Sequence, residues 1–364
     1  MSRLRDLIIV GGGPAGLAVG VVAAGRGLDV LLLERGALPA DKACGEGLLP
    51  AGVRALDALG ARALLDRSAS SPVRAIRWVD GSISAEARLP APFGLGVRRT
   101  ALSAALLARA RAVGVEVREN ATVRGHRRQS DEVEVEVHAD GGAERARLLV
   151  AADGLASSIR RREGLEVPSA GAPRFGLRRH FARAPWTDAV EVHFGDQVEA
   201  YVTPVGPERV GIAFLCEDRA RASYRALLAR FPELLRQVAG SSYDSELAGA
   251  GPLARAVRAR TADRLVLVGD AAGYLDAITG EGLSLAFQGA LALGRVLPDA
   301  LAAGATREVF AGWERGEARR FALYATTTRF VLGLARRPAA RRRSLGFLAR
   351  HPRLFAAMVG AVVK

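Results

Sequence analysis

The N-terminal part of the chain alternates between short apolar runs and stretches of small residues. Residues 7–10 (LIIV) and 30–33 (VLLL) are apolar, and residues 14–24 between them are rich in Ala and Val. A short apolar run bounded by turn residues is typical of a buried strand, and the longer Ala/Val-rich stretch favours a helix. This order predicts a strand–helix–strand unit of a parallel sheet.

Later segments repeat the buried-strand pattern and add an alternating one. Residues 148–152 and 265–268 are apolar runs that we expect to return to the parallel sheet. Residues 72–90 alternate polar and apolar positions around an Asp-Gly pair, which predicts a hairpin, and residues 174–215 contain several strand-like runs typical of an antiparallel sheet. Helical patterns predict the main helices at residues 51–65, 100–113, 219–238 and 282–297.

Composition narrows the class of protein. The 364 residues carry a formal net charge of +14, and Lys42 and Lys364 are the only lysines beside many arginines. These arginines are spread along the chain without interleaved aromatic residues, so we expect no nucleic-acid partner.

The start, MSRLRDLII, lacks the layout of a signal peptide, and no apolar run reaches membrane-spanning length, so we expect a cytoplasmic protein. The oligomeric state does not follow from these features.

Three glycines stand between the first predicted strand and its helix. In the pattern G-x-G-x-x-G, Gly11 permits the tight turn, Gly13 lets the backbone approach a pyrophosphate, and Gly16 lets helix and strand pack closely. The helix N-terminus offers free N–H groups to phosphates. Glu34 ends the second strand, where a carboxylate accepts hydrogen bonds from ribose hydroxyls. The unit predicts an adenine-dinucleotide site.

Two later motifs also place polar groups at strand ends. Asp153-Gly154 follows the run at residues 148–152, where the carboxylate can pin a loop, and Arg160 can pair with Asp153 or with a phosphate. Gly269-Asp270 follows the last apolar run, where the carboxylate can bind a ribityl hydroxyl. A Gly-Glu-Gly turn at residues 280–282 then opens a helix whose N–H groups can face an electron-rich ring.

The three motifs GGGPAG with Glu34-Arg35, ADGLASSIR, and GDAAG…GEG occur in the order found in one flavoenzyme superfamily. They resemble the single-component FAD-dependent monooxygenases of the para-hydroxybenzoate hydroxylase fold over most of residues 5–300. The resemblance implies FAD as cofactor and NAD(P)H as a transient reductant. It implies FAD contacts at Gly11, Gly13, Pro14, Ala15, Gly16, Glu34, Arg35, Cys44, Gly45, Arg99, Val123, Asp153, Gly269, Asp270, Gly280, Gly282 and Leu283.

The predicted elements and this resemblance give one architecture. We expect a mixed α/β (α+β) fold with a Rossmann-like FAD-binding domain, an inserted antiparallel-sheet substrate domain and a C-terminal helical segment. The FAD-binding domain is expected at residues 1–72, 96–172 and 255–300. The substrate domain is expected at residues 73–95 and 173–254, and the C-terminal helices at residues 301–364.

Two branches of the superfamily compete. DKACGEGLLP and GDAAGYLDAITGEG look like the geranylgeranyl-reductase-like branch, because Gly273 and Glu281 replace the His and Gln of typical aromatic hydroxylases. Prenyl reductases, however, carry a Tyr-x-Trp-x-Phe-Pro pattern where this chain reads Tyr201-Val-Thr-Pro, and the halogenase pattern GWxWxIP is absent.

We therefore expect a monooxygenase that uses NAD(P)H and O₂ through a flavin C4a-hydroperoxide. Its substrate would be a hydrophobic small molecule, aromatic, polyketide or lipid-like. One alternative is a geranylgeranyl-reductase-like enzyme that saturates C=C bonds of an isoprenoid. The alternative from another class is a non-catalytic FAD-binding protein.

Several side chains are candidates for chemistry, each beside a structural alternative. Cys44 is a redox-active or proton-donating thiol, or a small residue packed by its loop. Glu46 orients substrate or is a solvated loop acid, and Glu281 is a proton relay or a helix N-terminal acid. His193 and Tyr201 are candidate substrate contacts or structural strand residues. The five histidines lack metal-ligand spacing, so we expect no metal.

The last 28 residues, 337–364, are basic and amphipathic. Such a segment can cap the substrate pocket with its arginines in solvent. The alternative is a peripheral contact with an anionic membrane surface, which would suit a lipophilic substrate.

Overall fold

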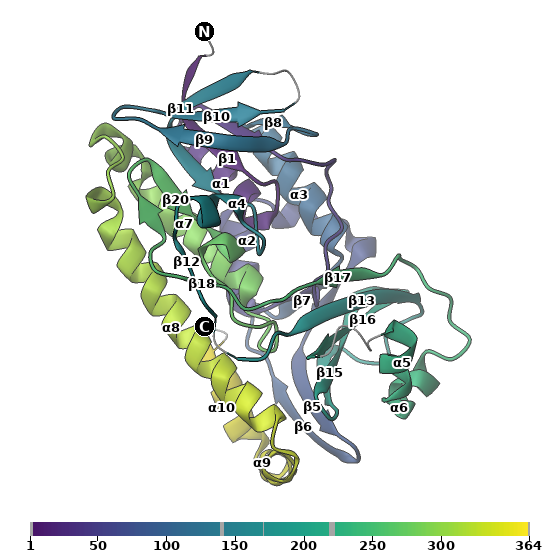
Figure 1. The fold of residues 1–364 in the computed structure, drawn as a ribbon. Helices are drawn as coiled ribbons and strands as arrows, with labels where there is room; N and C mark the ends of the chain where they lie inside the picture. Colours follow the sequence, from purple (N-terminus) through teal and green to yellow (C-terminus); the bar gives the residue numbers. More distant parts are fainter. Residues whose placement is uncertain (1–2, 139–141, 170, 218–222, 363–364) are drawn as a thin grey trace.

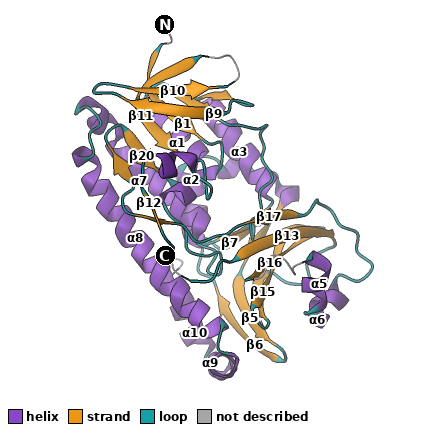
Figure 2. Cartoon of the chain, viewed as in Figure 1, coloured by secondary structure: helices purple, strands orange, loops and turns teal. Residues whose placement is uncertain are grey.

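The computed structural model describes residues 3–138, 142–169, 171–217 and 223–362. Its strands form two large sheets and two small ones (Figure 1, Figure 2). In the first large sheet, β1 (Leu4–Val10) pairs in parallel with β2 (Val30–Leu33) and with β11 (Ala143–Ala151), as the strand–helix–strand unit predicts. The strand order is β19-β20-β11-β1-β2-β8, and β10 joins β9 to β11; the remaining bounds are Glu116–Arg118 (β8), Val123–Arg128 (β9), Val133–Val137 (β10), Thr261–Ala262 (β19) and Leu265–Leu267 (β20).

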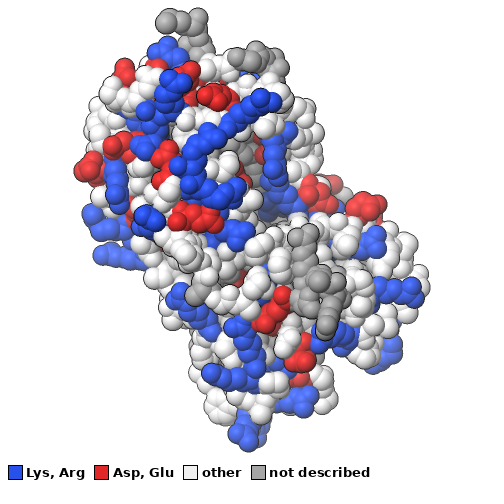
Figure 3. Space-filling view, viewed as in Figure 1, with Lys and Arg blue, Asp and Glu red and all other residues white. Residues whose placement is uncertain are grey.

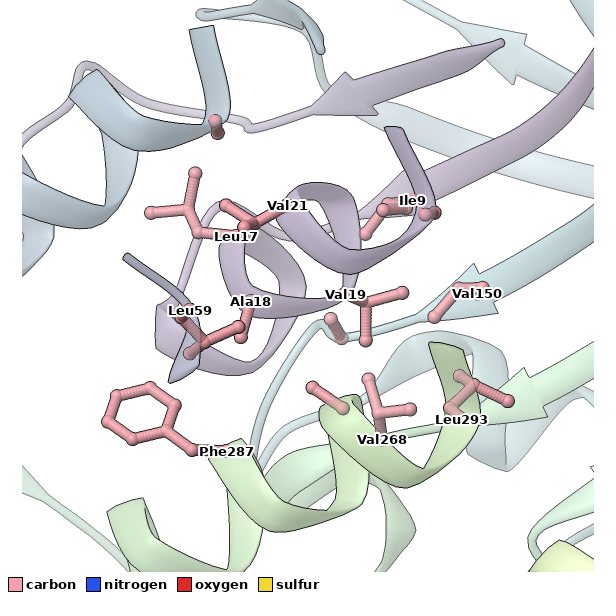
Figure 4. Packing of buried hydrophobic residues seen from close by; sticks show 14 of the residues in the cluster. Ile9, Leu17, Ala18, Val19, Val21, Leu59, Val150, Val268, Phe287 and Leu293 are labelled. Carbon is pink, nitrogen blue, oxygen red and sulfur yellow. The ribbon is translucent and has the colours of Figure 1, made fainter. Parts of the chain in front are cut away.

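Apolar clusters cover both faces of this sheet. Its helices are Pro14–Ala24 (α1), Pro50–Ala58 (α2), Arg99–Ala112 (α3), Ser158–Arg162 (α4) and Gly282–Ala302 (α7). Leu7 and Ile9 belong to one cluster and Ile8 to the other, because successive strand side chains point to opposite faces. The first cluster packs α1, α3 and α7 on the sheet, and Figure 4 shows Leu293 of α7 beside the sheet residue Val150.

The second large sheet contains the predicted hairpin and the predicted antiparallel strands. The strand order is β17-β13-β16-β15-β14-β5-β6. Neighbouring strands pair antiparallel, except that β14 and β5 pair in parallel. The bounds are Ala75–Asp80 (β5), Ile83–Arg88 (β6), Phe175–Ala182 (β13), Ala189–Phe194 (β14), Val198–Gly206 (β15), Arg209–Cys216 (β16) and Ala248–Ala250 (β17). The expected mixed α/β fold is thereby confirmed, while the exact division into domains stays a prediction.

Two predicted helices are shorter than expected. The stretch 219–238 forms two helices, α5 (Tyr224–Ala229) and α6 (Pro232–Gln237), and residues 219–222 lie outside the described residues. The chain breaks before Pro232, because proline disfavours a helical conformation in the residue before it. The stretch 51–65 ends its α-helix at Ala58, and a 3-10 turn (η1, Arg62–Leu64) follows.

Two small sheets lie between the large ones. One contains β3 (Gly47–Leu48), β7 (Gly94–Val97) and β4 (Ser70–Val73), and the other pairs β12 (Glu166–Val167) with β18 (Ala256–Val257). At Gly96 an added Cβ would lie 1.8 Å from the carbonyl oxygen of Pro204 in β15. This contact requires glycine and brings β7 directly onto the second large sheet. The further 3-10 turns are Arg67–Ala69 (η2), Gly269–Ala272 (η3) and Glu308–Phe310 (η4).

The C-terminal part forms three helices: Ala311–Ala335 (α8), Pro338–Arg350 (α9) and Pro352–Val362 (α10). Figure 1 shows α8 running along one side of both sheets, with α9 and α10 at its far end. Leu348 and Phe355 pack against Ala85 and Ala87 of β6. The buried Arg341 guanidinium lies 2.8 Å from the Asp80 carboxylate. Within the part of the chain that the structure describes, no helix is both long and apolar enough to cross a membrane.

Candidate cofactor and substrate site

A cavity of about 820 Å³ lies between the two large sheets. It begins at the first glycine motif and ends at α8 and α10. Its lining includes Gly13, Asp153 and Asp270, one from each of the three motifs. Motifs separated by more than a hundred residues therefore meet at one cavity. The other predicted contacts that line it are Pro14, Ala15, Arg35, Cys44, Gly45, Glu46, Arg99, Tyr201, Gly269, Gly280, Gly282 and Leu283.

The three glycines of the first motif have different surroundings. Gly11 has a φ of +111°, and an added Cβ would lie 2.4 Å from the carbonyl oxygen of Ala152. An added Cβ at Gly16 would lie 2.0 Å from the carbonyl oxygen of Gly11. Gly13 has nothing within 4 Å of such a Cβ and stands at the N-cap of α1. Gly11 and Gly16 therefore shape the turn, and Gly13 leaves open space where a pyrophosphate would reach the helix N-terminus.

Glu34 is buried and holds the glycine loop. Its Oε2 accepts a hydrogen bond from the Gly12 N–H at 2.6 Å, and its Oε1 accepts one from the Gly36 N–H at 3.3 Å. These bonds fix the carboxylate beside the loop. Val123 starts β9 and packs on the apolar cluster behind the sheet. Among the described residues, neither Val123 nor Glu34 lines the cavity itself.

Arg160 joins the second motif to the third. The buried guanidinium donates to the carbonyl oxygens of Leu155 at 2.7 Å and Ala271 at 3.2 Å. Among the described residues, Arg160 forms no ion pair with Asp153 and instead lies 3.6 Å from the Glu166 carboxylate, while the expected pairing with a phosphate stays a prediction. Asp153 Oδ2 instead accepts from the Ser158 N–H at 2.9 Å. Its Oδ1 is buried and has no hydrogen-bond partner among the described residues, so the site retains an acceptor for a ligand.

Asp270 stands where the third motif meets the first. An added Cβ at the preceding Gly269 would lie 2.7 Å from the Cβ of Ala15. Burial raises the pKa of Asp270, against the opposing effect of the nearby charges of Arg99 and Lys42. A carboxylate at this place can accept hydrogen bonds from hydroxyl groups of a ligand. Together with the open space at Gly13 and the free oxygen of Asp153, this arrangement fits a dinucleotide.

Cys44 lies in the loop between β2 and β3 and lines the cavity. Its Sγ accepts a hydrogen bond from the Glu46 N–H at 3.3 Å. Burial raises the pKa of the Cys44 thiol, so the group is protonated at neutral pH. Thr203 of β15 holds the same loop by donating to the carbonyl oxygen of Gly45 at 2.7 Å.

Glu46 is not a solvated loop acid, because only 2% of the residue is exposed. Its Oε1 accepts from Arg98 Nη1 at 3.0 Å and from the Arg99 N–H at 2.7 Å. Its Oε2 lies 2.5 Å from Nε2 of His180. The residue also has a φ of +59°, a left-handed conformation that is costly for a non-glycine residue. A dense set of partners holds this conformation at the cavity wall.

His180 of β13 is a site residue that the sequence patterns do not reveal. It is fully buried, and its Nδ1 lies 2.8 Å from the Ser245 hydroxyl and 3.1 Å from Arg178 Nη1. Burial lowers the pKa of His180, and the charges of Arg98 and Arg178 act in the same direction against Glu46. A neutral ring with its proton on Nε2 can donate to Glu46 and accept at Nδ1, and Arg98 Nη1 also lies 2.6 Å from Nε2 and 2.9 Å from Nδ1. The only sequence signal is a histidine among arginines in a strand.

Of the three remaining candidate residues, one lines the cavity and two do not. Tyr201 lines the cavity, and its hydroxyl donates to the carbonyl oxygen of Ile278 at 3.0 Å. His193 contacts Glu191 at 3.0 Å and is absent from the described cavity lining, so it has no observed place beside a substrate. Glu281 is the N-cap residue of α7 and is also absent from that lining. Burial raises the pKa of Glu281 to about 7.

Among the described residues no group of three His, Cys, Asp or Glu side chains is placed to hold a metal.

Comparisons with known proteins agree with this geometry. The family model described as "FAD binding domain" matches residues 5–323. Menaquinone reductase of Mycobacterium tuberculosis (strain ATCC 25618 / H37Rv) is 29% identical over 90% of this chain and 85% of the relative. Digeranylgeranylglycerophospholipid reductase 1 of Methanopyrus kandleri is 31% identical over 77% of each chain. Rifampicin monooxygenase of Streptomyces venezuelae is 29% identical over 79% of this chain and 63% of the relative.

Solved structures share the fold at low identity. A flavoprotein/dehydrogenase from Cytophaga hutchinsonii superposes with a TM-score of 0.82 at 17% identity and covers 100% of both chains. A mutant of the flavin-dependent brominase Bmp2 superposes with a TM-score of 0.84 at 17% identity, over 99% of this chain and 94% of the other. The family match covers most of the chain and includes all three motifs. The chain therefore belongs to the FAD-binding domain family of FAD-dependent oxidoreductases, and FAD is its cofactor.

Proposed function

We propose that this protein is an FAD-dependent monooxygenase that hydroxylates a hydrophobic small molecule with one polar end, using NAD(P)H and O₂. The observation that carries the proposal is the composition of the cavity. Its polar end lies at the three FAD motifs and the Cys44–Glu46 loop, and its far end is lined by Trp78, Phe330 and Phe355. One apolar chamber continuous with a dinucleotide site suits a lipophilic substrate held beside a flavin.

The chain's own residues hold the cofactor. Gly13 and the N-terminus of α1 would hold the pyrophosphate, and Asp270 would accept from the ribityl hydroxyls. The N-terminus of α7, which begins at Gly282, presents N–H groups to the cavity, where they would stabilise negative charge on the ring. When bound, FAD accepts hydride from NAD(P)H and activates O₂.

The remaining residues keep water out and orient the substrate. Val192, Leu215 and Val331 belong to one apolar cluster beside the cavity, which excludes water from the reacting groups. At the polar end, Arg99 and Arg178 line the cavity and can donate to an oxygen on the substrate. Glu46 and His180 hold the loop that carries Cys44, so they position the wall and need not touch the substrate.

One feature of β15 supports hydroxylation over prenyl reduction. The strand reads Tyr201-Val-Thr-Pro, without the aromatic pair of the prenyl-reductase pattern. In this chain Tyr201 bonds to Ile278 and Thr203 bonds to the Cys44 loop. In this strand, side chains that hydrogen-bond to neighbouring loops therefore stand where the reductase pattern has aromatic residues.

A second candidate function is the reduction of a C=C bond, and Cys44 favours it. The thiol lines the cavity and is protonated at neutral pH. In such a reaction one alkene carbon would take a hydride from reduced flavin, and the other would take the thiol proton. The names of two relatives, menaquinone reductase and digeranylgeranylglycerophospholipid reductase, also favour reduction.

Turnover with and without oxygen separates these functions. The flavin-loaded protein is incubated with NADPH or NADH and either a long-chain alkylphenol or geranylgeraniol. The proposal predicts that a hydroxylated alkylphenol forms only in air. A saturated product from geranylgeraniol under anaerobic conditions would establish the reductase instead. Flavin that neither nucleotide reduces, with or without these probes, would favour a non-catalytic protein.

A further inference from the structure

The far end of the cavity opens at the surface between α8 and α10. Phe330 of α8 and Met358 of α10 both line the cavity, yet 60% of Phe330 and 40% of Met358 is exposed. Residues that line a cavity and also face solvent mark its opening. We call the opening between Phe330 and Met358 the mouth.

Exposed apolar side chains continue from the mouth along both helices. Leu323 lies two turns before Phe330 on α8, and Leu354 lies one turn before Met358 on α10, so each pair shares a helix face. Leu323 is 61% exposed and Leu354 is 45% exposed. Two apolar stripes therefore flank the entrance to an apolar chamber.

The C-terminal segment that flanks the mouth carries charged side chains of one sign. Residues 318–364 contain ten Arg and one Lys and no Asp or Glu. Some of these arginines have acidic partners outside the segment, such as Asp80 for Arg341 and Glu217 for Arg336. Among the described residues of this segment, the exposed arginines without an ion pair to a carboxylate are Arg319, Arg329, Arg337, Arg343, Arg350 and Arg353. Figure 3 shows blue side chains over the region that α9 and α10 occupy in Figure 1.

We propose that the mouth and its two apolar stripes dock on an anionic lipid bilayer, and that the hydrophobic substrate enters the cavity from the acyl layer. Apolar side chains would enter the headgroup boundary while the arginines bind the anionic headgroups. The substrate then passes from lipid to cavity without crossing water. The entry of substrate from the lipid rests on the proposed function, because it takes the cavity as the substrate site. Docking of the mouth on the bilayer does not depend on that function.

Docking is measured without turnover, so its failure is distinguishable from failure of the proposed function. The flavin-loaded full-length protein is co-sedimented with vesicles of phosphatidylglycerol and phosphatidylcholine, and with vesicles of phosphatidylcholine alone. We expect binding to the mixed vesicles that falls as salt is raised, and little binding to phosphatidylcholine alone. Equal binding to both kinds of vesicle, or binding to neither, would overturn the proposal.

Two variants test the surface itself. The double variant Arg350→Gln with Arg353→Gln should weaken partition into the mixed vesicles by about thirty-fold. Each basic residue near an anionic surface contributes a similar amount to the binding free energy, so the two losses combine. Its matched control is Arg161→Gln with Arg225→Gln, which removes two exposed arginines elsewhere. Leu354→Ser should also weaken partition, whereas Leu235→Ser on α6 should not, although the two leucines are equally exposed at 45%. Equal effects of variant and control would overturn the proposal.

The position of the mouth is tested by fluorescence. In Phe330→Trp the new indole should be quenched by vesicles with brominated acyl chains, while in Leu235→Trp it should not. Retained flavin content and far-UV circular dichroism verify that the variants fold. If the wild-type protein is instead a dimer that ignores vesicles and Leu354→Ser makes it monomeric, a second copy of the chain covers this surface and the proposal is wrong.

Discussion

Oε2 of Glu46 lies 2.5 Å from Nε2 of His180, and this contact joins the loop after β2 to strand β13. The two residues are 134 positions apart in the chain, and Glu46 lines the cavity whereas His180 is absent from its described lining. Glu46 stands two residues from Cys44, and His180 is anchored by Ser245 and Arg178. The pair therefore sets where the cavity wall lies relative to the second large sheet.

Replacing His180 tests this positioning role. His180→Leu leaves Oε2 of buried Glu46 without its partner, which should cost about 1–3 kcal/mol in the free energy of unfolding. Displacement of the Cys44 loop should lower kcat/KM by roughly ten- to hundred-fold. His180→Gln retains an N–H donor and should recover most of both losses. The exposed His138→Leu is the control, and equal loss in the Leu and Gln variants would argue against positioning through this hydrogen bond.

Glu281 makes stability depend on pH. Its pKa is raised from 4.5 to about 7 by burial, so the folded state favours the protonated form. Its contribution is present below about pH 4.5 and is lost as the pH rises through about 7. Glu281→Gln should therefore raise the free energy of unfolding near pH 8 by at most roughly 3 kcal/mol and change it little near pH 4. Denaturant unfolding at the two pH values checks this, and an equal change at both would contradict it.

The glycines of the first motif should separate folding from cofactor binding. Gly16→Ala places a Cβ 2.0 Å from the carbonyl oxygen of Gly11 and should impair folding itself. Gly13→Val meets nothing in the protein within 4 Å of its Cβ and should fold normally, but its side chain enters the space for the pyrophosphate. We expect native circular dichroism with at least about ten-fold weaker FAD binding. A Gly13→Val protein with full flavin content would show that Gly13 does not face the FAD pyrophosphate.

Cys44 distinguishes the two candidate reactions. Cys44→Ala removes the thiol proton but keeps a small side chain in the loop. If hydroxylation is the reaction, kcat should change by less than about three-fold, because no proton is required from this residue. If C=C reduction is the reaction, kcat should fall by about a hundred-fold or more. Cys216→Ala in β16 is the control for loss of a thiol outside the cavity lining.

Local patterns predicted the elements around the expected FAD site better than those around the expected substrate site. The run at residues 7–10, the glycines after it and the strand ends at Asp153 and Asp270 carry short-range signals, because each depends on turns and strands of a few residues. The two-helix break before Pro232 was missed because the apolar pattern continues through it. The partnership of Glu46 with His180 has no local signal, since it forms only when the two sheets meet. The tail packs on β6, an arrangement set by long-range contacts such as Arg341 with Asp80.

Isotope labelling with ¹⁸O₂ shows whether this protein inserts oxygen into its substrate. The flavin-loaded protein, NADPH or NADH and a long-chain alkylphenol are incubated under ¹⁸O₂, and the product is examined by mass spectrometry. We expect one labelled oxygen atom in each product molecule and none when the label is supplied in water. A product without labelled oxygen, or a product that has gained only hydrogen, would contradict it.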